Sequence, residues 1–209
     1  MFTGIIEHLG EITAIEPQKS NLIFMIKSPE LKYKLGDSIA INGTCLTVIE
    51  IQKNHFKVEA IPETLKLTNL GQLKIEDKVN LEKPMKAGQT FDGHFVSGHI
   101  DFTAKVKKIS ADGESKRIFF EIKKGFEKFF ALKGSVAVNG VSLTISGLEK
   151  DQFEVCLIPY TLEKTNLGKL HVDNSVNIEI DIIARYLERL LEHKEEESHY
   201  FFLQKRGFI

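Results

Sequence analysis

The sequence predicts an all-β protein built from two similar antiparallel barrels, and three observations lead to this fold class. Residues 38–82 recur as residues 135–179 without a gap, at a constant offset (139 − 42 = 97), with about half of the positions identical. Each copy holds several short β-branched segments separated by turn signals, which is typical of a small closed or nearly closed barrel. Neither copy has the long helical segments that the crossovers of a parallel sheet require.

The repeat also defines the domain organisation. Two copies are too few for a solenoid, whereas 209 residues are enough for two small domains. We expect residues 1–90 and 91–181 to form the barrels, and residues 182–209 to form a C-terminal helix and tail. The junction lies in residues 84–95, because glycines, a proline and weak periodicity mark a connection. A duplicated barrel indicates a function that uses two similar pockets.

The first unit opens with strand signals in residues 5–15 and 22–26, which we expect to pair in antiparallel fashion. The Ser-Pro-Glu sequence that begins residues 28–35 predicts a short helix, with a cap, a proline at the first helical position and an acidic first turn. The strand signal of residues 38–51 is interrupted by an Asn-Gly pair, which favours positive φ in a tight turn.

The remaining strand signals of the first unit are residues 56–61, where apolar and polar residues alternate, and residues 79–81. Residues 67–73 between them predict a connection. The second unit repeats this order, starting at residues 96–101, and residues 126–132 take the place of the first short helix.

Beyond the second unit, the periodicity changes to that of an amphipathic helix. The apolar positions recur at helical spacing and are Ile182, Ile183, Tyr186, Leu187, Leu190 and Leu191. This stripe must be buried, either against its own barrel or by self-association. The helix is expected to end near the charged residues 193–197, and the aromatic residues 198–209 are expected to dock on a surface.

Composition excludes several classes of protein. The net charge of −1 and the lack of a basic cluster argue against nucleic-acid binding. The chain has no apolar run of membrane-spanning length and no basic segment at its start, so we expect a soluble, cytoplasmic protein without a membrane partner. The two cysteines, Cys45 and Cys156, occupy non-equivalent repeat positions, which favours free thiols over a disulfide or a metal pair.

Six motifs together resemble the riboflavin synthase family. In order they are MFTGII at 1–6, NGTCLTV at 42–48, GHFVSGHID at 93–101, NGVSLTI at 139–145, IPYTLEKTNLG at 158–168 and VNIEIDIIARY at 176–186. The resemblance covers residues 1–191 and implies two six-stranded Greek-key barrels, a C-terminal helix, a homotrimer and no cofactor. It also implies a reaction in which two molecules of 6,7-dimethyl-8-ribityllumazine exchange a four-carbon unit. The products are riboflavin and 5-amino-6-(ribitylamino)uracil.

Two pockets that bind the same compound suit this reaction, since holding the two molecules face to face is worth up to about 7–11 kcal/mol. The implied substrate-binding residues are Gly4, Ile5, Ile6, Cys45, Leu46, Thr47, Ile61, Pro62, Glu63, Thr64, Gly98, His99, Ile100, Lys133, Ser142, Leu143, Thr144, Ile158, Pro159, Tyr160 and Thr161. The threonines occur in both copies, and short hydroxyls with strand-edge backbone groups recognise a heterocycle well. The alternative role of these threonines is strand propensity alone.

Positions that differ between the copies are the candidates for chemistry. The implied catalytic residues are His99, Ser142, Cys45, Thr144 and Asp181. The repeat mate of His99 is Ile5 and that of Asp181 is Pro84, whereas Thr144 is included although its mate, Thr47, is identical. His99 suits proton transfer from an acidic methyl group at neutral pH, with His94 as the alternative. Cys45 either adds to an electrophilic ring carbon or activates water near it, where Ser142 of the other copy is a hydrogen-bonding group, or it is a small buried residue.

Two further differences concern substrate contacts. Lys133 replaces Gly36 and is either a surface charge or an orienting group, while Tyr160 replaces Glu63 and departs from the histidine or glutamate expected in the family. We further expect an active site shared between chains, in which Cys45 and Thr47 of one chain face His99, Ser142 and Thr144 of another.

Two alternative functions are considered. A non-catalytic lumazine or flavin carrier could share the duplicated barrel, but the Ser-Gly-His element at residues 97–99 is intact here. A barrel module that binds nucleic acid or protein is disfavoured by the neutral charge and by the lack of stacking aromatics.

Overall fold

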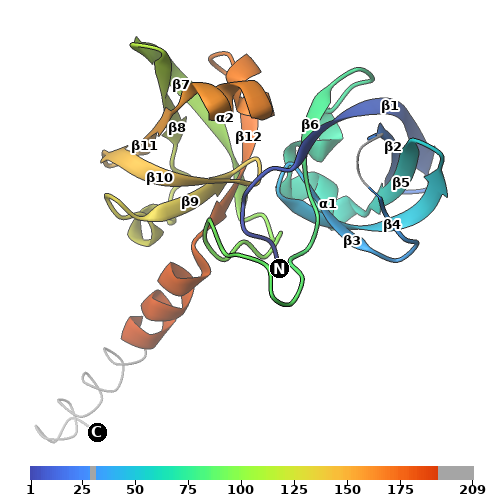
Figure 1. Cartoon of the computed structure of the whole chain (residues 1–209). Helices are drawn as coiled ribbons and strands as arrows, with labels where there is room; N and C mark the ends of the chain where they lie inside the picture. Colours follow the sequence, from blue (N-terminus) through green and yellow to red (C-terminus); the bar gives the residue numbers. More distant parts are fainter. Residues whose placement is uncertain (29–31, 193–209) are drawn as a thin grey trace, which may run out of the picture.

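The computed structural model describes residues 1–28 and 32–192, and it contains two closed six-stranded antiparallel barrels that lie side by side (Figure 1). The first barrel consists of β1 (His8–Gln18), β2 (Asn21–Lys27), β3 (Ser38–Ile41), β4 (Thr44–Gln52), β5 (His55–Ala60) and β6 (Lys78–Glu82). The second consists of β7 (Phe102–Asp112), β8 (Ser115–Glu121), β9 (Ser135–Val138), β10 (Val141–Leu148), β11 (Gln152–Leu157) and β12 (Ser175–Ile180). The predicted fold class is confirmed.

The two barrels have the same topology. The first follows the order β1-β2-β5-β4-β3-β6, and the second follows β10-β11-β8-β7-β12-β9, which is the same closed cycle when β7 to β12 are matched to β1 to β6. Each Asn-Gly pair forms the two-residue turn that the sequence predicts: Asn42 and Asn139 have φ of 47° and 45°, and the glycines that follow have 79°. Positive φ at both positions matches the twist of a hairpin.

Each barrel encloses its own apolar core, with Phe24 and Phe56 in the first and Phe120 and Phe153 in the second. A third, smaller cluster lies between the barrels and consists of Phe2, Ala40, Val96 and Ala137. Here the chain start pairs with the end of the interbarrel connection, because Phe2 N donates to Val96 O at 2.7 Å and Val96 N donates back at 3.2 Å.

Short helical turns follow the fifth strand of each barrel, where the sequence predicts only a connection at 67–73. They are α1 (Pro62–Leu67) and η1 (Asn69–Gln72), repeated as α2 (Pro159–Lys164) and η3 (Asn166–Lys169). A proline at the first helical position starts each α-helix, and a threonine hydroxyl caps each 3-10 turn. These helices are too short to give a periodic signal.

The other predicted helices have mixed outcomes. The helix predicted at 28–35 is not found at residues 32–34, which the structure describes as non-helical. Residues 29–31 of this prediction lie outside the described residues. In the second unit, η2 (Glu127–Phe129) does occupy the predicted place. The charged residues 193–197 and the aromatic tail at 198–209 lie outside the described residues.

The C-terminal helix, residues 182–192, projects away from both barrels (Figure 1). Its polar face contacts the second barrel: Lys128 Nζ lies 2.7 Å from Glu188 and 2.9 Å from Glu192. Its apolar face points outward, with Tyr186 65% and Leu190 67% exposed. The predicted periodicity is confirmed, and burial of the stripe against its own barrel is wrong for the described residues.

Candidate functional site

The opening segment of each unit crosses to the other barrel. Ser142 N on β10 donates to Gly4 O at 2.8 Å, and Cys45 N on β4 donates to Gly98 O at 2.9 Å. We call residues 4–6 and 98–100 the crossing segments. Each candidate pocket therefore combines a strand of one barrel with the crossing segment of the other unit.

The glycines of the crossing segments allow this close approach. A Cβ on Gly4 would lie 2.6 Å from the Cβ of Ser142, and one on Gly98 would lie 2.4 Å from the Cβ of Cys45. Both glycines also have positive φ, 79° and 85°. Only glycine combines that backbone conformation with the missing side chain, which explains its place in the two sequence motifs.

A buried glutamate anchors each crossing segment to the last strand of its own barrel. Glu82 accepts hydrogen bonds from Thr3 N at 2.6 Å, Thr3 Oγ1 at 2.8 Å and Gly4 N at 3.0 Å. Glu179 accepts the equivalent bonds from Ser97 and Gly98. Burial raises the pKa of Glu82 to about 7 and also raises the pKa of Glu179, although hydrogen bonds to both carboxylates act in the opposite direction.

The first pocket lies where β4 begins and β5 ends. Antiparallel pairing of these strands places the start of α1 at the same end of the barrel as Cys45 and Thr47. The predicted residues gathered there are Cys45, Leu46, Thr47, Ile61, Pro62, Glu63, Thr64, Gly98, His99 and Ile100. Thr47 and His99 are exposed, Cys45 is partly buried and Leu46 faces the core, as alternation along a strand requires.

The second pocket repeats this arrangement at the start of β10. The predicted residues gathered there are Gly4, Ile5, Ile6, Ser142, Leu143, Thr144, Ile158, Pro159, Tyr160 and Thr161. Ile6 and Tyr160 line a cavity of about 510 Å³ that also includes Glu163 and Lys164. Tyr160 is 67% exposed, and Lys164 Nζ lies 5.9 Å from the centre of its ring.

The pairing of residues differs in one respect from the sequence expectation. The sequence predicts that Cys45 and His99 come from different chains. Within one chain, however, the crossing segment that carries His99 is hydrogen-bonded to Cys45, because residues 98–100 cross to β4. His99 and Ile100 also line a second cavity, of about 400 Å³, beside Arg185 of the C-terminal helix.

Ser142 has a histidine neighbour, His94, which the sequence indicates only as an alternative base. His94 Nδ1 lies 2.7 Å from Ser142 Oγ. Burial lowers the pKa of His94, and the charge of Asp181 acts in the opposite direction. Asp181 itself caps the C-terminal helix, since its Oδ1 accepts from Ile183 N at 2.9 Å. This capping role gives Asp181 a structural function beside any chemical one.

Lys133 adopts a backbone conformation that is unusual for lysine. Its φ is +69°, close to the +84° of its repeat mate Gly36, and both amides donate to the equivalent strand carbonyls at 2.9 Å. A non-glycine residue in the left-handed region costs about 1–2 kcal/mol. The exposed Lys133 side chain occupies a position whose local geometry favours glycine. Lys19 and Lys53 also have positive φ, so this conformation by itself assigns no role to the side chain.

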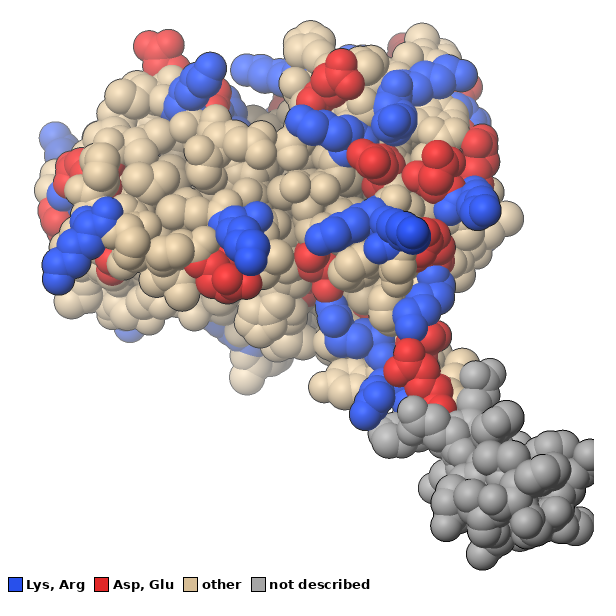
Figure 2. Space-filling model, turned by 180° about the vertical axis from the view of Figure 1, so that it is seen from behind, with Lys and Arg blue, Asp and Glu red and all other residues tan. Residues whose placement is uncertain are grey.

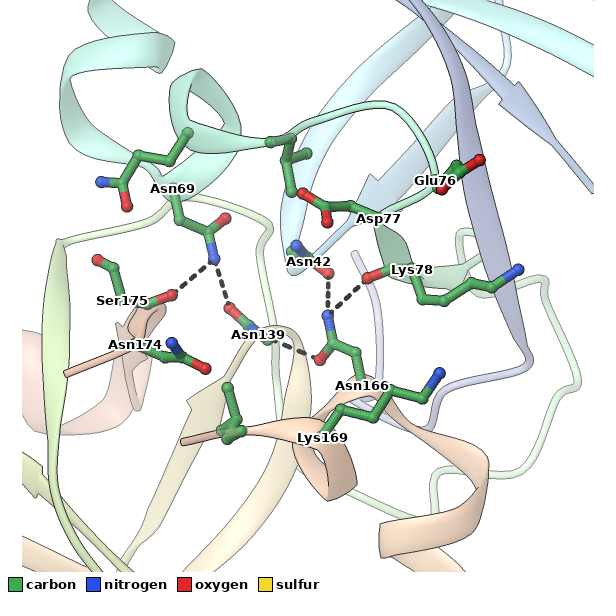
Figure 3. A pocket seen from close by; sticks show the side chains of 13 residues that line it. Asn42, Asn69, Glu76, Asp77, Lys78, Asn139, Asn166, Lys169, Asn174 and Ser175 are labelled. Carbon is green, nitrogen blue, oxygen red and sulfur yellow. Dashed lines mark hydrogen bonds between the residues drawn. The ribbon is translucent and has the colours of Figure 1, made fainter. Parts of the chain in front are cut away.

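A cluster of six asparagines joins the two barrels, and four of them, Asn42, Asn69, Asn139 and Asn166, line a cavity of about 390 Å³ (Figure 3). Its members are three repeat pairs, Asn42 and Asn139, Asn69 and Asn166, and Asn80 and Asn177. Asn177 Nδ2 donates to Asn42 O, and Asn80 Nδ2 donates to Asn139 O, both at 2.9 Å. Because the bonds are reciprocal, they fix how the barrels pack. The sequence signal was the recurrence of these asparagines at the offset of 97.

Other classes of site are absent from the described part of the chain. No group of three or more histidine, cysteine, aspartate or glutamate side chains there could hold a metal ion. Helices long and apolar enough to cross a membrane are also absent from residues 1–28 and 32–192. On the face shown in Figure 2, basic and acidic side chains are interspersed and form no continuous basic surface.

Comparisons with known proteins identify relatives along the whole chain. The lumazine binding domain family matches twice, at residues 3–84 and 97–181. Riboflavin synthase of Bacillus subtilis (strain 168) is 42% identical over 218 residues, which cover 100% of both chains. Riboflavin synthase of Schizosaccharomyces pombe is 40% identical over 196 residues, covering 92% of this chain and 94% of that protein.

Solved structures give the same result for the fold. LumP in complex with 6,7-dimethyl-8-(1'-D-ribityl) lumazine superposes with a TM-score of 0.78 at 25% identity, covering 86% of this chain and 98% of LumP. Its complex with riboflavin gives a TM-score of 0.81 at 24% identity, covering 86% and 99%. The sequence relatives match over the full length and at higher identity, and by that match the chain belongs to the riboflavin synthase family.

Proposed function

We propose that this protein transfers a four-carbon unit between two molecules of 6,7-dimethyl-8-ribityllumazine, releasing riboflavin and 5-amino-6-(ribitylamino)uracil. The observation that carries the proposal is that one chain builds two pockets from equivalent parts: a strand start, a proline-initiated helix and a crossing segment. Donor and acceptor are the same compound in this reaction, so equivalent pockets are what the chemistry requires.

The parts that the two pockets share are the proposed binding groups. Thr47 and Thr144 present hydroxyls at the exposed side of each strand start. The crossing segments and the residues before each helix add backbone donors and acceptors, which suit a heterocycle with alternating polar atoms. Fixing two such rings face to face replaces much of the entropic cost of their encounter, up to about 7–11 kcal/mol.

The parts that differ between the pockets are the proposed chemical groups. His99 accepts a proton from the acidic methyl group of one bound molecule. Cys45 adds to an electrophilic ring carbon in the first pocket, whereas Ser142 acts as a hydrogen-bonding group in the second, beside the shared Thr144. Lys133 and Asp181 orient the substrate or stabilise developing charge.

The reaction is balanced between its two substrates, because one molecule loses the four carbons that the other gains. We therefore propose that neither a metal nor an organic cofactor takes part.

Tyr160 contacts the ribityl chain in the second pocket, where the first pocket has Glu63.

We propose that the protein works as a cytoplasmic homotrimer. The exposed apolar face of the C-terminal helix supports self-association, since five large apolar side chains there have exposed fractions above one half: Ile183, Tyr186, Leu187, Leu190 and Leu191. A trimer would bring the first pocket of one chain to the second pocket of its neighbour.

A single absorbance experiment tests the activity. The purified protein should convert 6,7-dimethyl-8-ribityllumazine to riboflavin in buffer that contains a metal chelator and no added cofactor. Ligand binding seen by fluorescence, together with constant lumazine absorption, would replace this proposal with the carrier function.

A mixing experiment tests whether the active site is shared between chains. One variant has its first pocket blocked by Thr47→Phe, and the other has its second pocket blocked by Ser142→Phe. When the two inactive variants are unfolded together and refolded, shared sites should regain part of the activity, because some interfaces pair two intact pockets. If mixed oligomers confirmed by mass stay inactive at every ratio, sites lie within single chains.

A further inference from the structure

His94 is held rigidly beside the second pocket, although it belongs to the connection between the barrels. Its backbone N donates to Thr3 O at 3.1 Å. The preceding residue, Gly93, is packed so tightly that a Cβ there would lie 1.9 Å from the same oxygen. The backbone that carries the imidazole is therefore held against Thr3.

The imidazole of His94 has one hydrogen-bond partner among the described residues. Nδ1 lies 2.7 Å from Ser142 Oγ, whereas Nε2 is buried and has no protein partner in the part of the chain that the structure describes. The residue is only 7% exposed. A buried neutral imidazole carries one proton, so either Nδ1 donates to Ser142 or it accepts the hydroxyl hydrogen.

The surroundings of the Ser142 hydroxyl favour Nδ1 as the acceptor. The hydroxyl directs its own hydrogen to an acceptor, and among the described residues Nδ1 of His94 is the side-chain atom within hydrogen-bond distance of Oγ.

We propose that His94 is a positioning residue of the second pocket: Nδ1 accepts the hydrogen of the Ser142 hydroxyl, so that Oγ presents its lone pairs to the bound substrate. This inference rests on the proposed function. Ser142 then acts as a hydrogen-bond acceptor for an N–H or O–H group of the ligand, and the hydrogen bond to His94 makes Oγ more basic. The two pockets therefore differ in two ways. The first has a sulfur atom, at Cys45, where the second has an oxygen atom, at Ser142, and in the second pocket this oxygen acts as an acceptor because its hydrogen is bound to His94.

Two polar substitutions separate this role from a structural one. Asparagine places a side-chain acceptor near the position of Nδ1, whereas glutamine places it near the position of Nε2. His94→Asn should therefore keep turnover within about threefold of the wild type, while His94→Gln should lower it about tenfold, the effect of one lost hydrogen bond. The dissociation constant for 6,7-dimethyl-8-ribityllumazine should change less than turnover in both. His171→Gln, at an exposed turn of the same barrel, is the matched control and should change neither.

A double-mutant comparison adds a coupling test. In a Ser142→Ala background, His94→Gln should have no further effect on turnover, because the acceptor has lost its partner. Equal turnover of the Asn and Gln variants, or full additivity with Ser142→Ala, would overturn the proposal.

A spectroscopic readout does not depend on turnover. Long-range ¹⁵N NMR of the histidine side chains should show the His94 proton on Nε2, and Ser142→Ala should shift the Nδ1 resonance. A proton on Nδ1 would contradict the inference even in an active enzyme, whereas an Nε2 proton in a protein without turnover would contradict only the proposed function.

Discussion

At the scale of single residues, the most informative position is one where a lysine occupies a backbone conformation that favours glycine. Lys133 keeps the left-handed backbone of its repeat mate Gly36. Lys133→Gly should raise the free energy of unfolding by up to about 1 kcal/mol, because relief of the strain exceeds the entropic cost of glycine. Turnover should fall, since the side chain is lost from the second barrel. Urea denaturation and the lumazine assay measure the two effects.

The control for Lys133 is Asp173, whose φ of 70° is almost the same, although aspartate tolerates the left-handed region better than lysine. Asp173→Gly should stabilise the protein by less than Lys133→Gly and should leave turnover unchanged. If both variants gained stability and neither lost turnover, the lysine would be a surface charge.

A second residue-scale prediction concerns the crossing segment of the second unit. Gly98→Ala places a Cβ 2.4 Å from that of Cys45 and also forces alanine to φ of 85°. Overpacking and backbone strain together should lower the free energy of unfolding by about 2–4 kcal/mol. Gly113→Ala shares the positive φ but meets no atom within 4 Å, so it should cost only about 1 kcal/mol. If both variants lost the same free energy of unfolding, the added Cβ at position 98 would not clash with Cys45.

The repeat indicates candidate pocket residues, but it does not show which of them lie together. Gly98 and Cys45 belong to motifs that recur in both units, so the repeat predicts a role for them in the pockets. Their contact could not, because it depends on a crossing of residues 98–100 between barrels that no local pattern encodes. The hydrogen bond between His94 and Ser142 could not be predicted either, because the two residues are 48 positions apart in the chain and no local pattern links them.

At the scale of elements, β6 ends in Glu82 and β12 carries Glu179 directly before its last residue, and these glutamates anchor the crossing segments. The pKa of Glu82 is raised from 4.5 to about 7 in the folded protein. The folded state therefore binds a proton more tightly than the unfolded state. The stabilisation that proton binding at Glu82 contributes to the folded state is fully present below pH 4.5 and is lost as the pH rises through about 7. Its total size is on the order of 3 kcal/mol.

Glu82→Gln should remove this pH dependence. The free energy of unfolding of the wild type should decrease between pH 5 and pH 7.5 more than that of the variant. Glutamine offers one acceptor oxygen and loses the bond from Gly4 N, so the variant should be less stable at every pH. Urea denaturation at the two pH values gives the comparison, and parallel curves would show that Glu82 does not titrate in this range.

The strands were predictable because turn residues and alternation mark their ends. The Asn-Gly hairpin between β3 and β4 is the clearest case, since its dihedral requirement is local. The six-residue helices α1 and α2 were not predicted, because a helix of that length leaves no periodic stripe. Their start is determined by a proline and by the end of the preceding strand.

At the scale of the whole molecule, the asparagine cluster makes the two barrels one unit. Asn177 is fully buried; its Nδ2 donates to Asn42 O at 2.9 Å and its Oδ1 accepts from Asn69 N at 2.6 Å. Asn177→Ala should lower the free energy of unfolding by about 2–4 kcal/mol, because it leaves buried groups of the first barrel without partners.

The same variant should also separate the unfolding of the barrels. Calorimetry should show one transition for the wild type and two for Asn177→Ala. Asn174→Ala, which removes a side-chain bond within a turn of the second barrel, is the control and should keep a single transition. A single, merely shifted transition in Asn177→Ala would argue that other contacts couple the barrels.

As proposed, two equivalent pockets bring together two molecules of one compound. The most direct test is the molar ratio of 6,7-dimethyl-8-ribityllumazine consumed to riboflavin formed, measured by chromatography in chelator-treated buffer. We predict a ratio of two, with one molecule of 5-amino-6-(ribitylamino)uracil for each riboflavin. A ratio of one, or a requirement for a second carbon donor, would contradict it.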